Sequence, residues 1–244
     1  MHRLPLGEAA LRAAVPSCKS SPGLVQSARA KVNEQGRYMP IEAVIFDVGN
    51  VLIEWQPERY YDKVIGAERR RAMFAEVDLH GMNDLVDQGH HFTDTIYNWA
   101  EKYPDWRDEI RMWHDKWIEL AAPEIPHSVR LQRALRAKKI PVFALTNFGV
   151  QNFYYATTIY PFLNEFDRHY VSGRMKTVKP HPPIYEMVEA DCGVPPEALL
   201  FADDRIDNIE TARKRGWQTH HFTGPQGWAD RLVVEGLLTS EEAR

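Results

Sequence analysis

Four short polar motifs of the 244-residue chain carry side chains that together could transfer a phosphoryl group. Three of them come directly after apolar runs that have the length of buried strands. In open α/β sheets, ligands bind beyond the carboxyl ends of the strands, so residues at these positions are expected to meet at one edge. In chain order, the motifs are Asp47, Thr146-Asn147, Lys179-Pro180 and Asp203-Asp204-Arg205-Ile206-Asp207-Asn208.

The first and last motifs indicate a cation site. They hold four carboxylates, those of Asp47, Asp203, Asp204 and Asp207. At a shared edge these groups would repel one another, and some of them would become protonated. A hard divalent cation removes this repulsion, and Mg²⁺ prefers one or two direct carboxylates together with water and phosphate oxygens. We therefore expect Mg²⁺ as the cofactor.

The remaining polar groups suit a phosphate. Lys179 supplies a positive point charge for a phosphoryl oxygen, while Thr146 and Asn147 supply neutral donors. The carboxylate of Asp47 could attack phosphorus and form an aspartyl-phosphate, which divides the displacement into two steps. The cation, Lys179 and the neutral donors would stabilise charge on the transferring group. Each motif alone is common in turns and helix caps, and only their combination indicates catalysis.

The spacing of apolar residues predicts an α/β fold. Apolar runs at residues 41–46, 141–145, 166–171, 198–202 and 218–222 have the composition of buried strands. Helical patterns lie between several of them, and one begins at Pro182-Pro183 and ends at Gly193. Strands that alternate with helices predict a mostly parallel sheet that is covered on both faces.

Residues 56–127 differ from the rest of the chain. They contain four tryptophans, helical spacing such as that of Ile110, Trp113 and Trp117, and no convincing strand pattern. Because this stretch lies between the first and second strands, we expect a helical cap domain there, inserted over the sheet edge. Residues 39–55 and 128–244 would then form the core domain. The aromatic residues are interpreted as helix packing rather than as a ligand cage.

Composition and charge exclude several classes of function. The net charge is −4, so no general attraction to nucleic acid or to an anionic membrane is expected. No apolar run approaches the roughly 18 residues of a membrane-spanning helix. Cys18 and Cys192 form no metal-ligand or redox motif, and two cysteines are too few for a disulfide scaffold. A reducing compartment, the cytoplasm, is therefore the expected location.

Residues 1–38 have a basic composition of their own, with six Lys or Arg residues against two Glu. They are rich in Ala and Ser and show no sustained periodicity. We interpret them as a disordered extension, or as a stretch upstream of a functional start at Met39. The alternative is an organellar transit segment, which has a similar bias toward Arg and against acidic residues.

In this order, the four motifs resemble those of the haloacid dehalogenase-like (HAD) hydrolase superfamily, over residues 41 to about 235. The resemblance implies a Rossmann-like three-layer sandwich with a helical cap inserted after the first motif. It also implies a Mg²⁺-dependent phosphatase that hydrolyses a small phosphorylated metabolite. Gly49-Asn50, together with the spacing from Asp203 to Asn208, looks like bacterial sugar-phosphate phosphatases of the glucose-1-phosphatase type. The motifs are Phe46 to Leu52, Leu145-Thr146-Asn147, Lys179-Pro180 and Asp203 to Asn208.

The resemblance also implies roles for individual residues around the metal. Asp47 would be the nucleophile and a metal ligand, and the backbone carbonyl of Gly49 would also bind Mg²⁺. Asp204 would be the principal ligand of the last motif, with Asp203 and Asn208 supporting the metal shell.

Further roles concern the phosphate and the substrate. Thr146, Asn147 and Lys179 would hold the phosphate, while Asp207 would either join the site or cap the following helix. The expected partner is a small phosphorylated molecule rather than nucleic acid or a membrane, and no pattern in the sequence assigns an oligomeric state.

One position departs from the pattern of most phosphatases in the superfamily. They carry a second Asp two residues after the nucleophile, where it acts as a general acid and base, but this chain has Gly49. General acid catalysis is typically worth about 10²–10⁴-fold in rate. We therefore hypothesise a preference for leaving groups that need little protonation. A residue of the cap could instead supply the proton, and the candidates are Asp87, His90 and His91.

Two other functions fit parts of the pattern. A metal-free 2-haloacid dehalogenase on the same fold, in which Asp47 attacks carbon, also lacks a second Asp at position 49. It would leave Asp203-Asp204 as an unneeded repulsive pair, which favours the phosphatase. A catalytically silent HAD-like domain with a binding role is the second alternative. Retention of the nucleophile, the phosphate donors, the lysine and the metal carboxylates argues against it.

Overall fold

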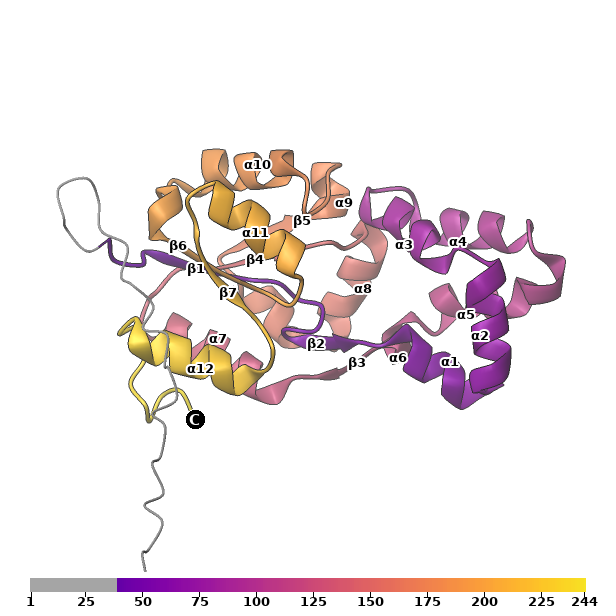
Figure 1. Cartoon of the computed structure of the whole chain (residues 1–244), viewed down its shortest axis with the longest axis horizontal. Coiled ribbons are helices and arrows are strands. Elements are labelled where there is room, and N and C mark those ends of the chain that lie inside the picture. Colours follow the sequence, from indigo (N-terminus) through magenta and orange to yellow (C-terminus); the bar gives the residue numbers. More distant parts are fainter. Residues whose placement is uncertain (1–38) are drawn as a thin grey trace, which may run out of the picture. The chain divides into compact units, whose positions relative to one another are not determined.

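The computed structural model describes residues 39–244, so the interpretation of residues 1–38 lies outside the described part of the chain (Figure 1). A parallel sheet with the strand order β5–β4–β1–β6–β7 forms the centre of the fold. The predicted α/β fold with a mostly parallel sheet is confirmed. The strands are β1 (Ala43–Phe46), β4 (Val142–Thr146), β5 (Arg168–Val171), β6 (Leu199–Asp203) and β7 (Gln218–His221).

Strand β1 lies in the middle of the sheet and pairs with β4 on one side and β6 on the other. All four of its residues are buried, as expected for a parallel strand that is covered on both faces. The chain moves outward from β1 through β4 to β5, and then returns to the other side for β6 and β7. This reversal creates a topological switch point at the carboxyl end of β1, which is where α/β sheets bind ligands.

Alternate residues of β1 point into two different apolar clusters. Val44 and Phe46 belong to the cluster that includes residues of α7, α8 and α12, and Trp228 of α12 contacts Phe46 edge-to-face. Ala43 and Ile45 belong to the cluster with α10 and α11 on the opposite face. The helices are α7 (Pro126–Ala137), α8 (Val150–Ile159), α10 (Pro182–Cys192), α11 (Ile206–Lys214) and α12 (Pro225–Val234).

A two-stranded antiparallel ribbon, β2 (Ile53–Trp55) with β3 (Ala121–Glu124), joins this core to the helices of residues 57–120. The expectation of no strand within residues 56–127 is therefore wrong at β3. Its sequence, Ala-Ala-Pro-Glu, lacks apolar alternation, and pairing with β2 is what makes it a strand. The helices are α1 (Pro57–Ile65), α2 (Ala67–Glu76), α3 (Leu79–Asp87), α4 (Phe92–Ala100), α5 (Arg107–Asp115) and α6 (Trp117–Leu120).

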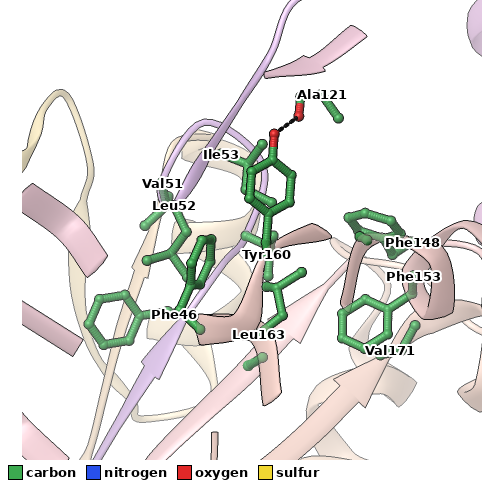
Figure 2. Close-up of a cluster of buried hydrophobic side chains, with 14 of the residues drawn as sticks. Phe46, Val51, Leu52, Ile53, Ala121, Phe148, Phe153, Tyr160, Leu163 and Val171 are labelled. Atoms are coloured by element: carbon green, nitrogen blue, oxygen red, sulfur yellow. Dashed lines mark hydrogen bonds between the residues drawn. The ribbon is translucent and has the colours of Figure 1, made fainter. Parts of the chain in front are cut away.

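The ribbon is held to the core by a buried tyrosine. Figure 2 shows Tyr160, just after α8, with its hydroxyl donating to the carbonyl oxygen of Ala121 in β3 at 2.7 Å. Phe46, Leu52 and Leu163 are buried in the same cluster. Apolar packing thus continues from the end of β1 to the start of the helical segment.

Helix α3 also contacts the core directly. The hydroxyl of Ser172, at the start of the short helix α9 (Ser172–Met175), donates to the carbonyl oxygen of Asp87 at 2.6 Å. The same hydroxyl oxygen accepts from the backbone N–H of Phe148 at 2.8 Å. The ammonium group of Lys176 donates to the carbonyl oxygen of Gly89 at 2.7 Å. These contacts fix the carboxyl end of α3 against the loop that follows β4.

None of the helices within residues 39–244 is long and apolar enough to cross a membrane.

We expect Gly173→Ala to destabilise this junction. A Cβ at position 173 would lie 2.9 Å from the carbonyl oxygen of Phe148 and 3.1 Å from the Cα of Gly149, both of them backbone atoms. Overpacking of this kind costs about 1–3 kcal/mol, which urea denaturation would measure. Gly227→Ala in α12 is the control, because its nearest neighbour would be a His220 ring atom at 3.9 Å. Equal stability of the two variants would contradict the prediction.

Candidate active site

The loop after β1 places Asp47 at the switch point. Its carboxylate Oδ1 accepts from the backbone N–H of Val48 at 2.7 Å, and the side chain is buried. Asn50 adopts a left-handed conformation, with φ of 53°, which Asn tolerates better than most residues. Its Oδ1 accepts from the N–H of Trp55 at 3.0 Å, and its Nδ2 donates to Asp204 Oδ2 at 3.0 Å. Asn50 therefore joins the loop after β1 to the loop after β6, with Gly49 lining the pocket beside it.

Lys179 is the buried cation of the site. Its Nζ lies 2.9 Å from Asp47 Oδ1 and 2.7 Å from Asp203 Oδ2, and it donates to the carbonyl oxygen of Leu145 at 2.9 Å. Burial alone would lower the pKa of Lys179, but Asp203 and Asp47 outweigh it and keep that pKa above the ordinary value. The side chain is therefore a charged donor that connects β1, β4 and β6.

Asp203 is fully buried, and both of its carboxylate oxygens are occupied by protein donors. Oδ1 accepts from the N–H of Arg205 and from Asn208 Nδ2, while Oδ2 accepts from Lys179 and from the same Asn208 amide. The neighbouring Asp204 lines the pocket. Asp207 forms an ion pair with Arg205 and accepts from the N–H of Asn208 at the start of α11. Of the three carboxylates in this motif, Asp204 is thus the one that lines the pocket.

Three of the four acidic groups lie close together, and Asp207 is not among them. Asp47, Asp203 and Asp204 each offer an oxygen, and these atoms lie within 4.8 Å of one another. Burial raises the pKa of Asp47 to about 7, and Asp203 and Asp204 add to the effect while Lys179 opposes it. Burial also raises the pKa of Asp204. Two carboxylates whose ionisation is disfavoured in this way form a site that a divalent cation would stabilise.

The two residues of the second motif, Thr146 and Asn147, have different surroundings. Thr146, the last residue of β4, is buried and lines the pocket. The side chain of Asn147 instead makes two hydrogen bonds to the backbone of Lys179, accepting from its N–H at 2.8 Å and donating to its carbonyl oxygen at 2.9 Å. Asn147 therefore positions Lys179 in addition to lining the pocket.

One face of α3 closes the pocket opposite the strand ends. Its four polar residues stand at helical spacing, and all of them line the same pocket as Asp47: His80, Asn83, Asp84 and Asp87. The sequence patterns singled out Asp87 alone among them. Their period of three and four residues is visible in the sequence, but a polar helical stripe usually faces solvent.

Two further pocket residues carry buried polar atoms without hydrogen-bond partners among the described residues. They are Trp117, through its indole Nε1, and Asn152, through its Oδ1. The Oδ1 of Asn208 is a third such atom in the same pocket. Unpaired buried polar atoms are rare in proteins and often indicate a ligand, an ion or ordered water. Asn208 is one of the residues singled out from the sequence, whereas no sequence pattern identifies Trp117 or Asn152 as pocket residues, because their neighbours come from distant parts of the chain.

A family model for haloacid dehalogenase-like hydrolases matches residues 41–216. The chain belongs to the haloacid dehalogenase-like hydrolase family. The match covers more than half of the chain and contains all four polar motifs. The chain is thus a hydrolase, as predicted.

Relatives and solved structures agree with this assignment. Over 73 residues the chain is 32% identical to a D-ribitol-5-phosphate phosphatase of Bacteroides thetaiotaomicron, an alignment that covers 30% of this chain and 35% of that protein. A HAD family enzyme of the same organism has a similar fold, with a TM-score of 0.62, 22% identity, and coverage of 79% of this chain and 98% of the other. An L-2-haloacid dehalogenase of Xanthobacter autotrophicus gives a TM-score of 0.54 at 16% identity, with coverage of 80% and 83%.

We expect Lys179→Met to lower the free energy of unfolding by about 3–5 kcal/mol in the absence of divalent cations. The substitution leaves Asp47 and Asp203 buried without their counter-charge, which is the costly way to break a buried ion pair. Lys138→Met is the control, because Lys138 pairs with Glu242 at the surface and such pairs contribute at most about 1 kcal/mol. Urea denaturation of both variants would measure the difference, and equal losses would contradict the expectation.

Proposed function

We propose that this hydrolase is a magnesium-dependent phosphatase, in which Asp47 attacks a small phosphorylated metabolite and forms an aspartyl-phosphate. One observation carries the proposal: Asp47 lies at the switch point, bonded to a charged buried lysine and grouped with two further carboxylates. The helical segment of residues 57–120 would act as the cap that encloses the substrate. A solved structure of the HAD family enzyme from Bacteroides thetaiotaomicron contains magnesium and inorganic phosphate, which supports the same chemistry here.

The residues present fit magnesium. All of the groups offered to a cation are hard oxygen ligands, and the unpaired buried Oδ1 of Asn208 supplies one more beside the acidic groups. Asp47, Asp204, Asn208 and the Gly49 carbonyl would hold the ion. Asp203 would support the metal ligands without binding the ion directly, because its own oxygens are already bonded to protein groups. When bound, the ion would neutralise charge on the phosphoryl oxygens.

The side chains of the site would have separate roles in phosphoryl transfer. Lys179 fixes one oxygen of the Asp47 carboxylate and supplies positive charge next to the phosphoryl group. Thr146 and Asn147 would donate to phosphoryl oxygens, and the Asn147 side chain also holds Lys179 in place. Asp47, whose Oδ2 has no hydrogen-bond partner among residues 39–244, would attack with this oxygen.

The leaving group is proposed to carry hydroxyl groups. A hydroxyl both donates and accepts, and the pocket offers an unpaired donor on Trp117 and an unpaired acceptor on Asn152. Asp84 and Asn83 on α3 add further polar contacts. The similarity to a phosphatase named for D-ribitol 5-phosphate supports a sugar or polyol phosphate, although the alignment spans about a third of that relative.

Phosphatase activity with Mg²⁺ should disappear in Asp47→Asn. The amide is a poor nucleophile, so we expect kcat to fall by more than about 10³-fold toward p-nitrophenyl phosphate. Chelation of divalent cations with EDTA should abolish wild-type activity, and added Mg²⁺ should restore it. Asp108→Asn is the control, because this side chain is 87% exposed on α5. Chloride release from 2-chloropropionate without Mg²⁺, in place of phosphate release, would instead indicate a dehalogenase.

A second test concerns the leaving group. Trp117→Phe removes the unpaired indole N–H and keeps an aromatic ring against Phe148, whose centroid lies 5.2 Å away. We expect KM for D-ribitol 5-phosphate to rise by about 2–10-fold, the value of one hydrogen bond. KM for phenyl phosphate, which has no hydroxyl on its leaving group, should stay unchanged. A similar rise with both substrates would mean that the indole N–H does not bind substrate hydroxyls.

A further inference from the structure

Position 49 has room for a Cβ atom but carries no acidic side chain. A Cβ added to Gly49 would meet only the Cβ of Trp55, at 3.9 Å, and the backbone there is not left-handed. The absence of an acid at this position is therefore not forced by packing. If the proposed phosphatase is correct and its leaving group needs protonation, the proton donor comes from another element around the pocket.

Asp87 is a buried acidic group of this pocket whose side chain is held by hydrogen bonds. It is the last residue of α3, it is 8% exposed, and it lines the same cavity as Asp47. Its Oδ2 accepts from Asn83 Nδ2 at 3.0 Å, and Asn83 Oδ1 accepts from the indole N–H of Trp113 at 3.1 Å. Trp113 is fully buried, so this chain of hydrogen bonds fixes the orientation of the carboxyl group.

The backbone of Asp87 is fixed as well. Its carbonyl oxygen accepts from Ser172 of the core at 2.6 Å, so the residue is attached to both the helical segment and the sheet. Gly149, which follows β4, approaches α3 so closely that an added Cβ would lie 2.4 Å from Val86. Asp87 is thus held against the loop that carries Thr146 and Asn147, although it belongs to a different part of the chain.

The surroundings of Asp87 favour the protonated acid. Burial raises the pKa of Asp87 well above its usual range, and the negative charges of Asp84 and Asp47 add to the effect. Lys179 and the backbone N–H of Gly149 act in the opposite direction and are outweighed. A neutral carboxylic acid beside the nucleophile has the protonation state that a general acid needs.

The other candidates are less well placed. His90 and His91 do not line the pocket of Asp47, and they border a separate surface depression together with Trp99 and Lys102. His80 does line the pocket, but its side chain is 62% exposed and lies 3.6 Å from Glu58 at the surface. Neither arrangement holds a ring nitrogen firmly inside the site.

We propose that Asp87 is the general acid and base of this hydrolase, in place of the residue missing at position 49. In the first step, Asp47 bonds to phosphorus, the phosphorus–oxygen bond to the leaving group breaks, and the Asp87 proton moves to the departing oxygen. In the second step, water attacks the phosphorus of the aspartyl-phosphate and gives its proton to Asp87. Phosphate leaves, the Asp47 carboxylate returns, and Asp87 is again an acid.

Asp87→Asn tests this role, because the amide retains an oxygen for the bond from Asn83 but cannot donate a proton of suitable acidity. We expect kcat/KM with Mg²⁺ to fall by about 10²–10⁴-fold for phenyl phosphate, whose leaving group needs protonation. For 2,4-dinitrophenyl phosphate, whose leaving group departs unprotonated, the fall in kcat for formation of the aspartyl-phosphate should be slight. The burst of dinitrophenolate in stopped-flow kinetics measures that step separately from hydrolysis of the intermediate.

The control is Asp108→Asn, the same substitution at an exposed site, which should leave both reactions unchanged. An equal loss with both esters, or none with phenyl phosphate, would overturn the assignment of Asp87. Wild-type protein that hydrolyses neither ester would instead refute the proposed phosphatase. Because a Cβ fits at position 49, adding Gly49→Asp to Asp87→Asn is expected to restore phenyl phosphate hydrolysis selectively.

Discussion

The buried ammonium group of Lys179 is the interaction on which the site depends. Transfer of a charge from water to the protein interior costs free energy. This cost is offset here because three oxygens contact one Nζ atom. These oxygens belong to Asp47, Asp203 and Leu145, at the ends of three adjacent strands. The ion cluster can therefore form only when β4, β1 and β6 lie side by side in register. The same lysine also places a positive charge next to the Asp47 carboxylate, so the arrangement serves both the fold and the chemistry.

Around this cluster, the polar side chains fall into two groups. Some have their hydrogen-bonding capacity satisfied by the protein, as Asp203 does with Lys179 and Asn208. Others line the pocket and carry a buried polar atom without a partner among the described residues, as Trp117 and Asn152 do. The side chains bonded to protein groups fix the positions and charges of the site before a ligand binds. The unpaired groups of the pocket therefore need not reorganise on binding. Preorganised polar groups of this sort account for much of the electrostatic contribution to catalysis.

The helical segment of residues 57–120 contributes one side of the pocket, through residues of α3 and α6. Tyr160 holds its ribbon and Ser172 holds the end of α3, so this segment is attached to the core at two separate places. Because of this attachment, the polar face of α3 lines the same cavity as Asp47. A pocket built from two parts of the chain can keep its phosphoryl chemistry constant while the leaving-group side varies in sequence.

The sequence by itself determined the central strands, the alternation of strands with helices, and the four polar motifs at the strand ends. These are local patterns, since a buried strand needs a short apolar run and its end needs a polar turn. The strand β3 and the two roles of Asn147 were not predictable, because they depend on partners far along the chain. Only the tertiary structure decided that Asp87 lines the same pocket as Asp47 while His90 does not. The physical reason is that a side chain's burial and charge environment are set by contacts between distant segments, which residue types and spacing do not encode.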